Sequence, residues 1–423
     1  MMAPRTEARI RRLLYLEIIW SSVLGGITAF NAVYLLRLGG TNFDVSLNTA
    51  LPSLGAVLIS VPAGHFLQSR AHPGRWTLLC LALYWTGFLL LGAVPWVHIG
   101  GLTASLLAVI LLFTASLPAQ IFAVGIYPLL ADMVSEQQRI RVFSMRAIIN
   151  ACTISVVTFV VGQWLSRTPF PFNYQVAYVV AWLCGMASVT HLILASRLVG
   201  ARAAAKPTPA AAAASLRRFW PTDLAQQPDF VHFTLNSLMH NLALWLAGPL
   251  YVLYFVRQLG ATDAWLGLYG TVTSLSTIVG LLFWRRVAER IREARTVRLT
   301  VISVGFMPLL AGLAPNLNMM LLLTAINGFF TAGIIISTIN VMLKTLPQDR
   351  QPQFMGLYTA ALNAGSFTAP LVAVALAGRW GLGPTLVGCG VVGLFGGLSH
   401  WVWRVPGPQP NPPVQVQPEI ESA

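Results

Sequence analysis

The chain has 423 residues, of which 56% are hydrophobic and only 9% are charged, whereas soluble proteins carry about 25% charged residues. A soluble protein of this length needs far more charge on its surface, so the composition excludes soluble enzymes and secreted domains. The mean hydropathy of +0.68 predicts a chain surrounded by lipid, with room for about a dozen helices of ~20 residues each.

Long apolar runs, typical of transmembrane helices, occur along the chain in two groups of six. The first group covers residues 13–36, 45–68, 76–95, 103–131, 142–166 and 174–196. The second group covers residues 230–256, 264–284, 299–314, 318–343, 353–378 and 383–403, with a short ninth run. Because the runs are continuous rather than alternating, they argue against membrane strands. We therefore expect an all-α integral membrane protein with 12 transmembrane helices.

The two groups are separated by one long polar break at residues 197–229, whose Ala/Pro tract AAAKPTPAAAAA is typical of a mobile linker. The residues after Arg404 are rich in proline and predict a disordered tail. The expected organisation is an N-terminal six-helix bundle at 1–196, a cytoplasmic linker at 197–229, a C-terminal six-helix bundle at 230–404 and a disordered cytoplasmic tail at 405–423.

The 27 Lys and Arg residues are distributed unevenly over the predicted loops and linker. If both termini are cytoplasmic, only four of these residues fall on the outer side, namely Arg37, Arg167, Arg257 and Arg379. Such a bias follows the positive-inside rule. The net charge of +14 therefore indicates membrane orientation rather than nucleic-acid binding. We expect an integral protein of a bacterial cytoplasmic (inner) membrane with both termini in the cytoplasm.

The two halves of the chain repeat each other at an offset of 220 residues. The segment YLLR at 34–37 aligns with YFVR at 254–257. Asp44 and Asp263 each open the second helix of their half, where a short carboxylate can cap free backbone N–H groups. Matches at one fixed offset predict a duplicated unit, and hence two pseudo-symmetric bundles. The further aligned pairs are Gly40 with Gly260, Arg70 with Arg290 and Arg75 with Arg295.

With these features, residues 10–405 resemble the major facilitator superfamily, whose members have two six-helix bundles, a cytoplasmic linker and both termini inside. The family's loop between helices two and three contains an Asp-Arg pair. Here Gln68 replaces the Asp and Ser69-Arg70 follows, whereas the second half keeps a carboxylate in Glu289-Arg290. The resemblance implies that this loop helps to close the cytoplasmic side. The gate candidates are Arg70, Arg75, Glu289 and Arg290, for which plain positive-inside anchoring is the alternative.

The resemblance also implies that helices one, four, seven and ten line a central cavity. Glu17 is the only carboxylate well inside a predicted span, and ionisable groups within a membrane are functional candidates by default. Glu17, Ser21, Gly25 and Thr28 share one face of the first helix, and Asn236, His240, Ala243, Ala247 and Tyr251 share one face of the seventh. The candidate substrate-binding residues are Glu17, Gln120, Asn150, Asn236, His240, Asn241, Trp245, Asn327, Asn340 and Asn363.

Glu17 and His240 are also the candidates for proton coupling, because a carboxylate that alternates between wet and dry surroundings can bind and release a proton. Each candidate has a structural alternative. Glu17 could reach the cytoplasmic interface, and His240 could be a neutral histidine bonded to a neighbouring helix. Isolated Asn and Gln residues often join membrane helices.

These features predict a secondary transporter, proton-coupled, that moves a small, neutral or amphipathic organic solute by alternating access, with export favoured over import. The alternatives are a facilitative uniporter, a non-transporting receptor or a lipid-handling membrane enzyme. The chain lacks the nucleotide-binding motif, HExxH and Gly-x-Ser-x-Gly, so we expect no enzyme activity, no cofactor and no metal. The expected partners are a small-molecule substrate, membrane lipids and protons, without nucleic acid, for a monomeric protein. Helix-five and helix-four features of drug/proton antiporters are absent, so no substrate is named.

Overall fold

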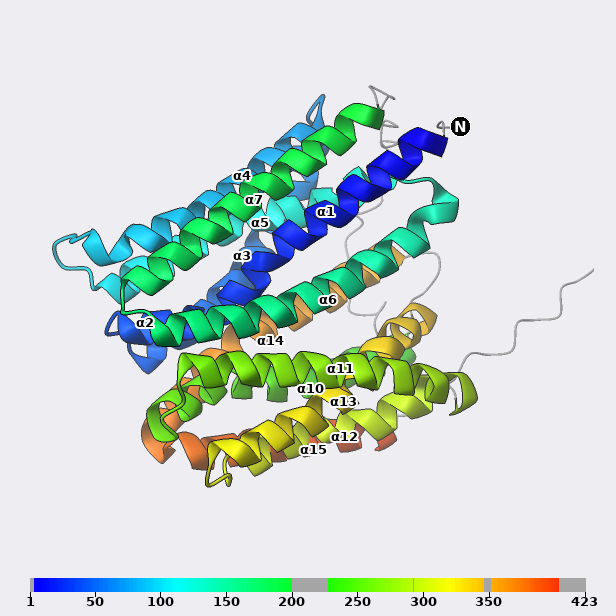
Figure 1. Cartoon of the computed structure of the whole chain (residues 1–423). Coiled ribbons are helices and arrows are strands. Elements are labelled where there is room, and N and C mark those ends of the chain that lie inside the picture. Colours follow the sequence, from blue (N-terminus) through cyan, green and yellow to red (C-terminus); the bar gives the residue numbers. More distant parts are fainter. Residues whose placement is uncertain (1–3, 200–226, 292, 346–350, 403–423) are drawn as a thin grey trace, which may run out of the picture.

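The structure is a computed structural model that describes residues 4–199, 227–291, 293–345 and 351–402 (Figure 1). The first half contains α1 (Pro4–Thr28), α2 (Asn31–Arg37), α3 (Asn42–Gln68), α4 (Pro73–Ala93), α5 (Ala104–Met133), α6 (Glu136–Arg167) and α7 (Phe172–Val199). The second half contains α10 (Pro228–Leu253), α11 (Asp263–Ile291), α12 (Glu293–Ala311), α13 (Leu317–Thr345), α14 (Gln351–Trp380) and α15 (Leu382–Val402). A 3-10 turn, η1 (Val94–Trp96), follows α4, and a π-helical turn, η2 (Tyr254–Gln258), follows α10.

Every predicted apolar run coincides with a helix or a pair of helices, which confirms the all-α fold. Among the described residues, ten helices are long and apolar enough to cross a membrane, and the pair α1–α2 makes eleven if it is one span. The remaining helix, α12, has 19 residues and occupies the position of the short ninth run. Counting α12 as a span gives the twelve helices that the sequence predicts.

The boundaries predicted for the first and ninth spans are wrong. The first run was expected as one helix over 13–36, but α1 begins at Pro4 and is separated from α2 by a bend of 42° at residues 29–30. Residues 4–12 are good helix formers that hydropathy does not detect, because they are polar. Similarly, α12 begins at Glu293 and ends at Ala311, so it is shifted toward polar residues at its N-terminal end.

The helices form two bundles, and in Figure 1 the helices of the first half lie above those of the second half. In the first bundle α1 packs against α6 and α7, and α4 packs against α5 and α7. In the second, α10 packs against α14 and α15, and α12 packs against α13 and α15. The bundles meet along two seams, α6 with α11 and α3 with α14. Each half therefore uses its second and fifth spans at the interface, as expected for a duplicated unit.

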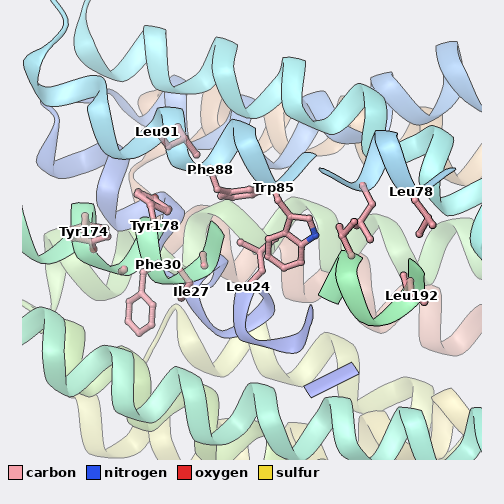
Figure 2. Close-up of a cluster of buried hydrophobic side chains, with 14 of the residues drawn as sticks. Leu24, Ile27, Phe30, Leu78, Trp85, Phe88, Leu91, Tyr174, Tyr178 and Leu192 are labelled. Carbon is pink, nitrogen blue, oxygen red and sulfur yellow. The ribbon is translucent and has the colours of Figure 1, made fainter. Parts of the chain in front are cut away.

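The first bundle has an aromatic core between α1, α2, α4 and α7 (Figure 2). Trp85 is 2% exposed and lies flat on α7 at Gly185, where a Cβ atom would come within 2.0 Å of the indole ring. The hydroxyl of Tyr34 donates to the carbonyl of Leu91 (2.7 Å), and that of Tyr178 donates to Asn31 (3.1 Å). These bonds satisfy polar groups that would be costly to leave unpaired in a dry interior.

The second bundle is held by close contact between glycine-bearing helices. A Cβ atom on Gly393 of α15 would come within 2.7 Å of the Cα of Gly305 on α12, and one on Gly390 would come within 2.4 Å of the Leu309 side chain. Small residues allow such backbone approach, which is the usual means of helix association in membranes. The residues at this crossing therefore cannot be enlarged without moving a helix.

The turns after α2 and η2 show both the repeat and its limits. Gly39 and Gly260 both have positive φ, 83° and 66°, a conformation that favours glycine, although the 220-residue offset aligns Gly260 with Gly40. As predicted, Asp44 caps its helix, in a capping box with Thr41. Asp263, expected to act in the same way, instead pairs with Arg37 of the other half. Of the expected linker, 197–199 belong to α7 and 228–229 to α10, while 200–226 lie outside the described residues, as does the tail at 405–423.

Candidate functional site

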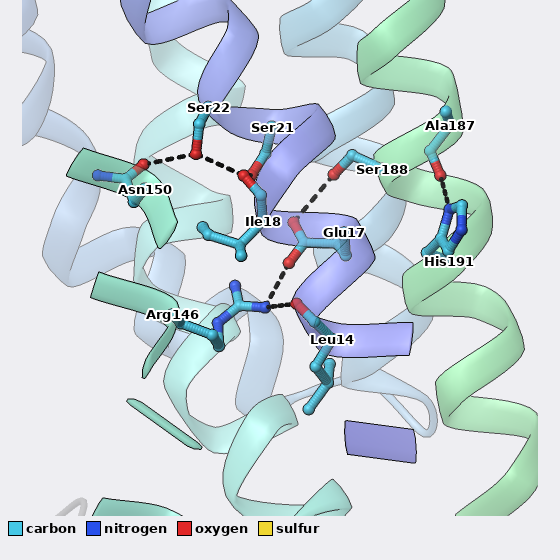
Figure 3. Close-up of polar contacts among 10 residues, drawn as sticks. All are labelled: Leu14, Glu17, Ile18, Ser21, Ser22, Arg146, Asn150, Ala187, Ser188 and His191. Atoms are coloured by element: carbon cyan, nitrogen blue, oxygen red, sulfur yellow. Dashed lines mark hydrogen bonds and ion pairs between the residues drawn. The ribbon is translucent and has the colours of Figure 1, made fainter. Parts of the chain in front are cut away.

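The side chain of Glu17 is 3% exposed and forms a charged cluster with residues of two neighbouring helices (Figure 3). Arg146 of α6 donates to one carboxylate oxygen (2.5 Å), and the hydroxyl of Ser188 on α7 donates to the other (3.0 Å). Arg146 also donates to the backbone carbonyl of Leu14 (2.7 Å). Glu17 is therefore not at a solvated interface, because it is buried and paired between α1, α6 and α7.

A second polar contact joins α1 and α6 one turn further along. The hydroxyl of Ser22 donates to the side-chain oxygen of Asn150 (2.8 Å). Arg146 and Asn150 are four residues apart, so they lie on the same face of α6 and meet Glu17 and Ser22 in register. The first bundle thus contains a polar cluster, made of Glu17, Ser22, Arg146, Asn150 and Ser188.

Sequence reasoning missed Arg146, which was counted among the cytoplasmic loop residues that orient the chain. The structure places it inside α6, with its side chain 11% exposed. A signal was present in the sequence. Arg146 lies inside the apolar run predicted at 142–166 and precedes Asn150 by one helical turn.

On the predicted face of α1, Glu17 and Gly25 pack against neighbouring helices of the first bundle. Glu17 meets α6 and α7, and a Cβ atom on Gly25 would come within 2.8 Å of Ile154 on α6. Ser21 and Thr28 both donate to carbonyl oxygens of their own helix, those of Ile18 and Gly25.

The predicted face of α10 is also buried, with Asn236, His240, Ala243 and Ala247 all less than 9% exposed. It packs against α15, because a Cβ atom on Gly396 would come within 3.1 Å of the His240 backbone nitrogen. The rings of His240 and His400 have their centroids 6.4 Å apart. His400 is bonded through its Nδ1 to the Gly396 carbonyl (2.9 Å).

The other cavity candidates lie on α5, α10, α13 and α14. Gln120 of α5 donates to the carbonyl of Pro52 on α3 (3.5 Å), and Asn241 donates to the carbonyl of Ser237 on its own helix (2.8 Å). Trp245 packs against α14, where a Cβ atom on Gly365 would come within 2.8 Å of its ring. Asn363 lies half-buried on α14. Asn340 belongs to α13, and its side chain lies outside the described residues.

Asn327 lines a cavity of about 310 Å³ between α12 and α13. Apart from Asn327 and Ser303 the lining is apolar, and the lining residues Leu299, Phe306 and Ile326 are exposed on the outside of the bundle. Asn327 is thus associated with a groove beside α12 and α13, where its side-chain oxygen has no hydrogen-bond partner among the described residues.

The gate candidates lie on loops and helix ends. Arg70 is exposed, and its guanidinium lies over the rings of Phe66 and Trp76, 4.6 Å and 4.9 Å from their centroids. Arg75 and Arg290 are exposed as well, and the side chain of Glu289 lies outside the described residues. The ion pairs that the described residues form are those of Glu17 with Arg146 and Arg37 with Asp263.

The helices, their two seams and the charged cluster inside one bundle define an integral membrane protein built of two pseudo-symmetric six-helix bundles. The sequence model described as Major Facilitator Superfamily matches residues 233–421. That match covers 189 of the 423 residues, so the chain is similar to this family over its second half.

Curated relatives include the multidrug resistance protein MdtG of Serratia proteamaculans (strain 568), 25% identical over 173 residues, which are 38% of this chain and 42% of that protein. MdtG of Salmonella paratyphi C (strain RKS4594) is 28% identical over 156 residues, 36% of this chain and 38% of that protein. The matches thus span about two fifths of the relatives' length.

Solved structures share the fold over nearly the whole chain. A bacterial homologue of the iron transporter ferroportin, in an inward-facing state, has a TM-score of 0.71 and 11% identity, covering 95% of this chain and 99% of that chain. The nucleoside transporter NupG has a TM-score of 0.67 and 12% identity, covering 94% and 100%.

Proposed function

We propose that the protein is a secondary transporter of a cytoplasmic membrane that exports a small, neutral or amphipathic organic solute by alternating access. The observation that carries this proposal is the arrangement of two pseudo-symmetric bundles that meet along two seams, α6 with α11 and α3 with α14. Two bundles joined in this way can rock against each other as rigid bodies, which exposes a site between them to either side in turn.

The nature of the solute is inferred from charge and from the relatives. The described residues place few charges within the spans, and Glu17, the carboxylate in the first span, is neutralised by Arg146. A multiply charged solute would need compensating charges, so an amphipathic solute with at most one charge fits better. The MdtG relatives are described as multidrug resistance proteins, which supports export.

Proton coupling is assigned to Glu17. Its carboxylate is held by Arg146 and Ser188, so proton binding to Glu17 would remove the charge that holds Arg146 against α1. The arginine would then lose its strongest partner and the α1–α6 contact would loosen, so that protonation and helix movement are linked.

A facilitative uniporter is the second candidate, and the same contacts favour it. All partners of Glu17 belong to the first bundle, so the Glu17–Arg146 pair could simply hold α1, α6 and α7 together. A pair with that role would stabilise the bundle without moving protons. The two candidates differ in what happens when Glu17 loses its charge.

Reconstituted vesicles separate these functions. The purified protein in vesicles, with ethidium as the amphipathic probe, should accumulate the dye against its gradient when a pH gradient is imposed. Glu17→Gln removes the charge and keeps the shape. Under coupled transport, the variant should lose uphill accumulation but retain downhill exchange of labelled for unlabelled ethidium. Uphill accumulation at the parent rate would show that another group couples transport to protons, whereas a parent protein that equilibrates the dye without accumulating it would be a uniporter. A panel of other amphipathic dyes tests the solute class.

A further inference from the structure

An ion pair with a buried carboxylate joins the two bundles at Arg37 and Asp263, at the ends that the positive-inside pattern predicts to be the outer ends. Arg37 is the last residue of α2, and its guanidinium pairs with the carboxylate of Asp263, the first residue of α11. The Asp263 side chain is 1% exposed and that of Arg37 is 33% exposed. Tyr174 of α7 donates to the second carboxylate oxygen (3.4 Å), and its ring centroid lies 5.7 Å from the guanidinium. Asp263 is thus held by two residues of the other bundle.

A second arginine crosses the interface in the opposite direction. Arg257, which the 220-residue repeat aligns with Arg37, donates to the carbonyl of Gly40 (2.9 Å) and to the side-chain oxygen of Asn42. These acceptors are neutral. The carboxylate that could have paired with Arg257, that of Asp44, accepts hydrogen bonds from Thr41 in its own turn.

Below the ion pair, the backbones of α6 and α11 touch. A Cβ atom on Gly162 would come within 2.7 Å of the Asp263 carbonyl and 2.9 Å of the Gly267 Cα. A Cβ atom on Gly267 would come within 2.8 Å of the Thr158 carbonyl. Two turns below Asp263, the hydroxyl of Thr271 bonds across the same seam to the Ser155 carbonyl (3.3 Å). The outer end of this seam is therefore closed by side chains and by backbone contact.

We propose that these residues form an outer latch with two unequal arms. The Arg37–Asp263 arm holds the outer side shut, and the Arg257 arm contributes little. This rests on the proposed alternating-access function, because a transporter must release such contacts to open outward. The inequality follows from burial and charge. Without Arg37, the Asp263 carboxylate is buried and lacks its cation in the closed state. Opening returns this carboxylate to water, so the loss of Arg37 favours the open state. The acceptors of Arg257 are neutral, so its loss leaves no buried charge unpaired and changes the balance little.

The symmetry of the two arms supplies a matched pair of variants, Arg37→Gln and Arg257→Gln. Both are compared in a cysteine-free protein that carries Thr271→Cys as a reporter beneath the latch. The measurement is the rate at which a membrane-impermeant thiol reagent, added outside intact cells, labels the reporter. We expect Arg37→Gln to raise the rate about tenfold, since it leaves Asp263 without its charged partner. Arg257→Gln should raise it by less than about twofold.

Equal labelling rates in the two variants, or a parent rate in Arg37→Gln, would overturn the latch. If Arg37→Gln does not yield folded protein, Arg37→Lys keeps the charge and loses the planar guanidinium, and it should still label about threefold faster than the parent. A labelling rate in Arg37→Lys equal to that of the parent would also overturn the latch. Labelling requires no substrate, so a latch that responds as expected in a protein that transports nothing would refute the proposed function alone.

Discussion

At the scale of single residues, two arginines have partners that the sequence does not reveal. Arg146 is largely buried against Glu17, and Arg37, itself exposed, pairs with the buried Asp263, whereas the positive-inside pattern treats every arginine alike. The difference between an anchoring arginine and a paired one is set by which helix lies opposite. Arg141, five residues before Arg146 on α6, is exposed and shows the anchoring case.

The buried pair in the first bundle gives a stability prediction. Arg146→Met should lower the free energy of unfolding by about 3 kcal/mol, because it leaves the Glu17 carboxylate buried without its cation. The double variant Glu17→Gln with Arg146→Met should lose clearly less, since no lone charge remains. Thermal unfolding of the detergent-purified protein measures both.

Arg141→Met is the control on the same helix and should change stability by no more than about 0.5 kcal/mol. If Arg146→Met alone is as stable as the double variant, then the loss of Arg146 does not leave an unpaired charge on Glu17.

At the scale of helices, the contacts between α6 and α11 and between α12 and α15 depend on glycine. Gly162 with Gly267, and Gly305 with Gly393, bring backbones together so closely that a single Cβ atom would collide. The sequence shows the glycines but does not say which of them meet a partner. Gly248 of α10 is also within a helix, yet a Cβ atom there would meet nothing within 4 Å.

This contrast predicts opposite signs for the same substitution. Gly248→Ala should raise stability by up to about 1 kcal/mol, because alanine favours a helix more than glycine does. Gly267→Ala gains the same preference but forces its Cβ toward the Thr158 carbonyl, so it should lower stability by about 1–3 kcal/mol.

Both variants can be compared by thermal unfolding in one detergent. If Gly267→Ala raises the stability, α6 and α11 can move apart without a loss of free energy. The contact between these two helices would then not hold the outer end closed.

At the scale of the whole molecule, orientation in the membrane remains a prediction from the charge distribution. The turn at Ser69, between α3 and α4, is exposed at one end, and the turn at Gly100, between α4 and α5, is exposed at the other. The positive-inside pattern predicts the first turn in the cytoplasm and the second outside.

In a cysteine-free protein, Gly100→Cys should therefore react with an impermeant thiol reagent in intact cells, and Ser69→Cys should react only after the cells are opened. Both positions are exposed turns, so each serves as the accessibility control for the other. The reverse pattern would invert the topology and with it the expected direction of transport.

The helices and their division into two halves can be predicted from the amino-acid sequence alone. Continuous apolar runs mark spans because every backbone polar group in lipid must bond within its own helix, and the 220-residue repeat marks two similar bundles. It also singled out Glu17, because a lone carboxylate in an apolar run is conspicuous whatever surrounds it.

Only the tertiary structure decided what each polar residue contacts. Glu17 was predicted as a cavity residue, yet its partners are on α6 and α7, and the predicted face of α10 packs against α15. Asp44 and Asp263 both lie in the first turn of the second span of their half, but one caps its helix and the other pairs across the interface. Helical periodicity places residues on a common face and leaves open which neighbour that face meets, because the neighbour is set by packing between segments far apart in the chain.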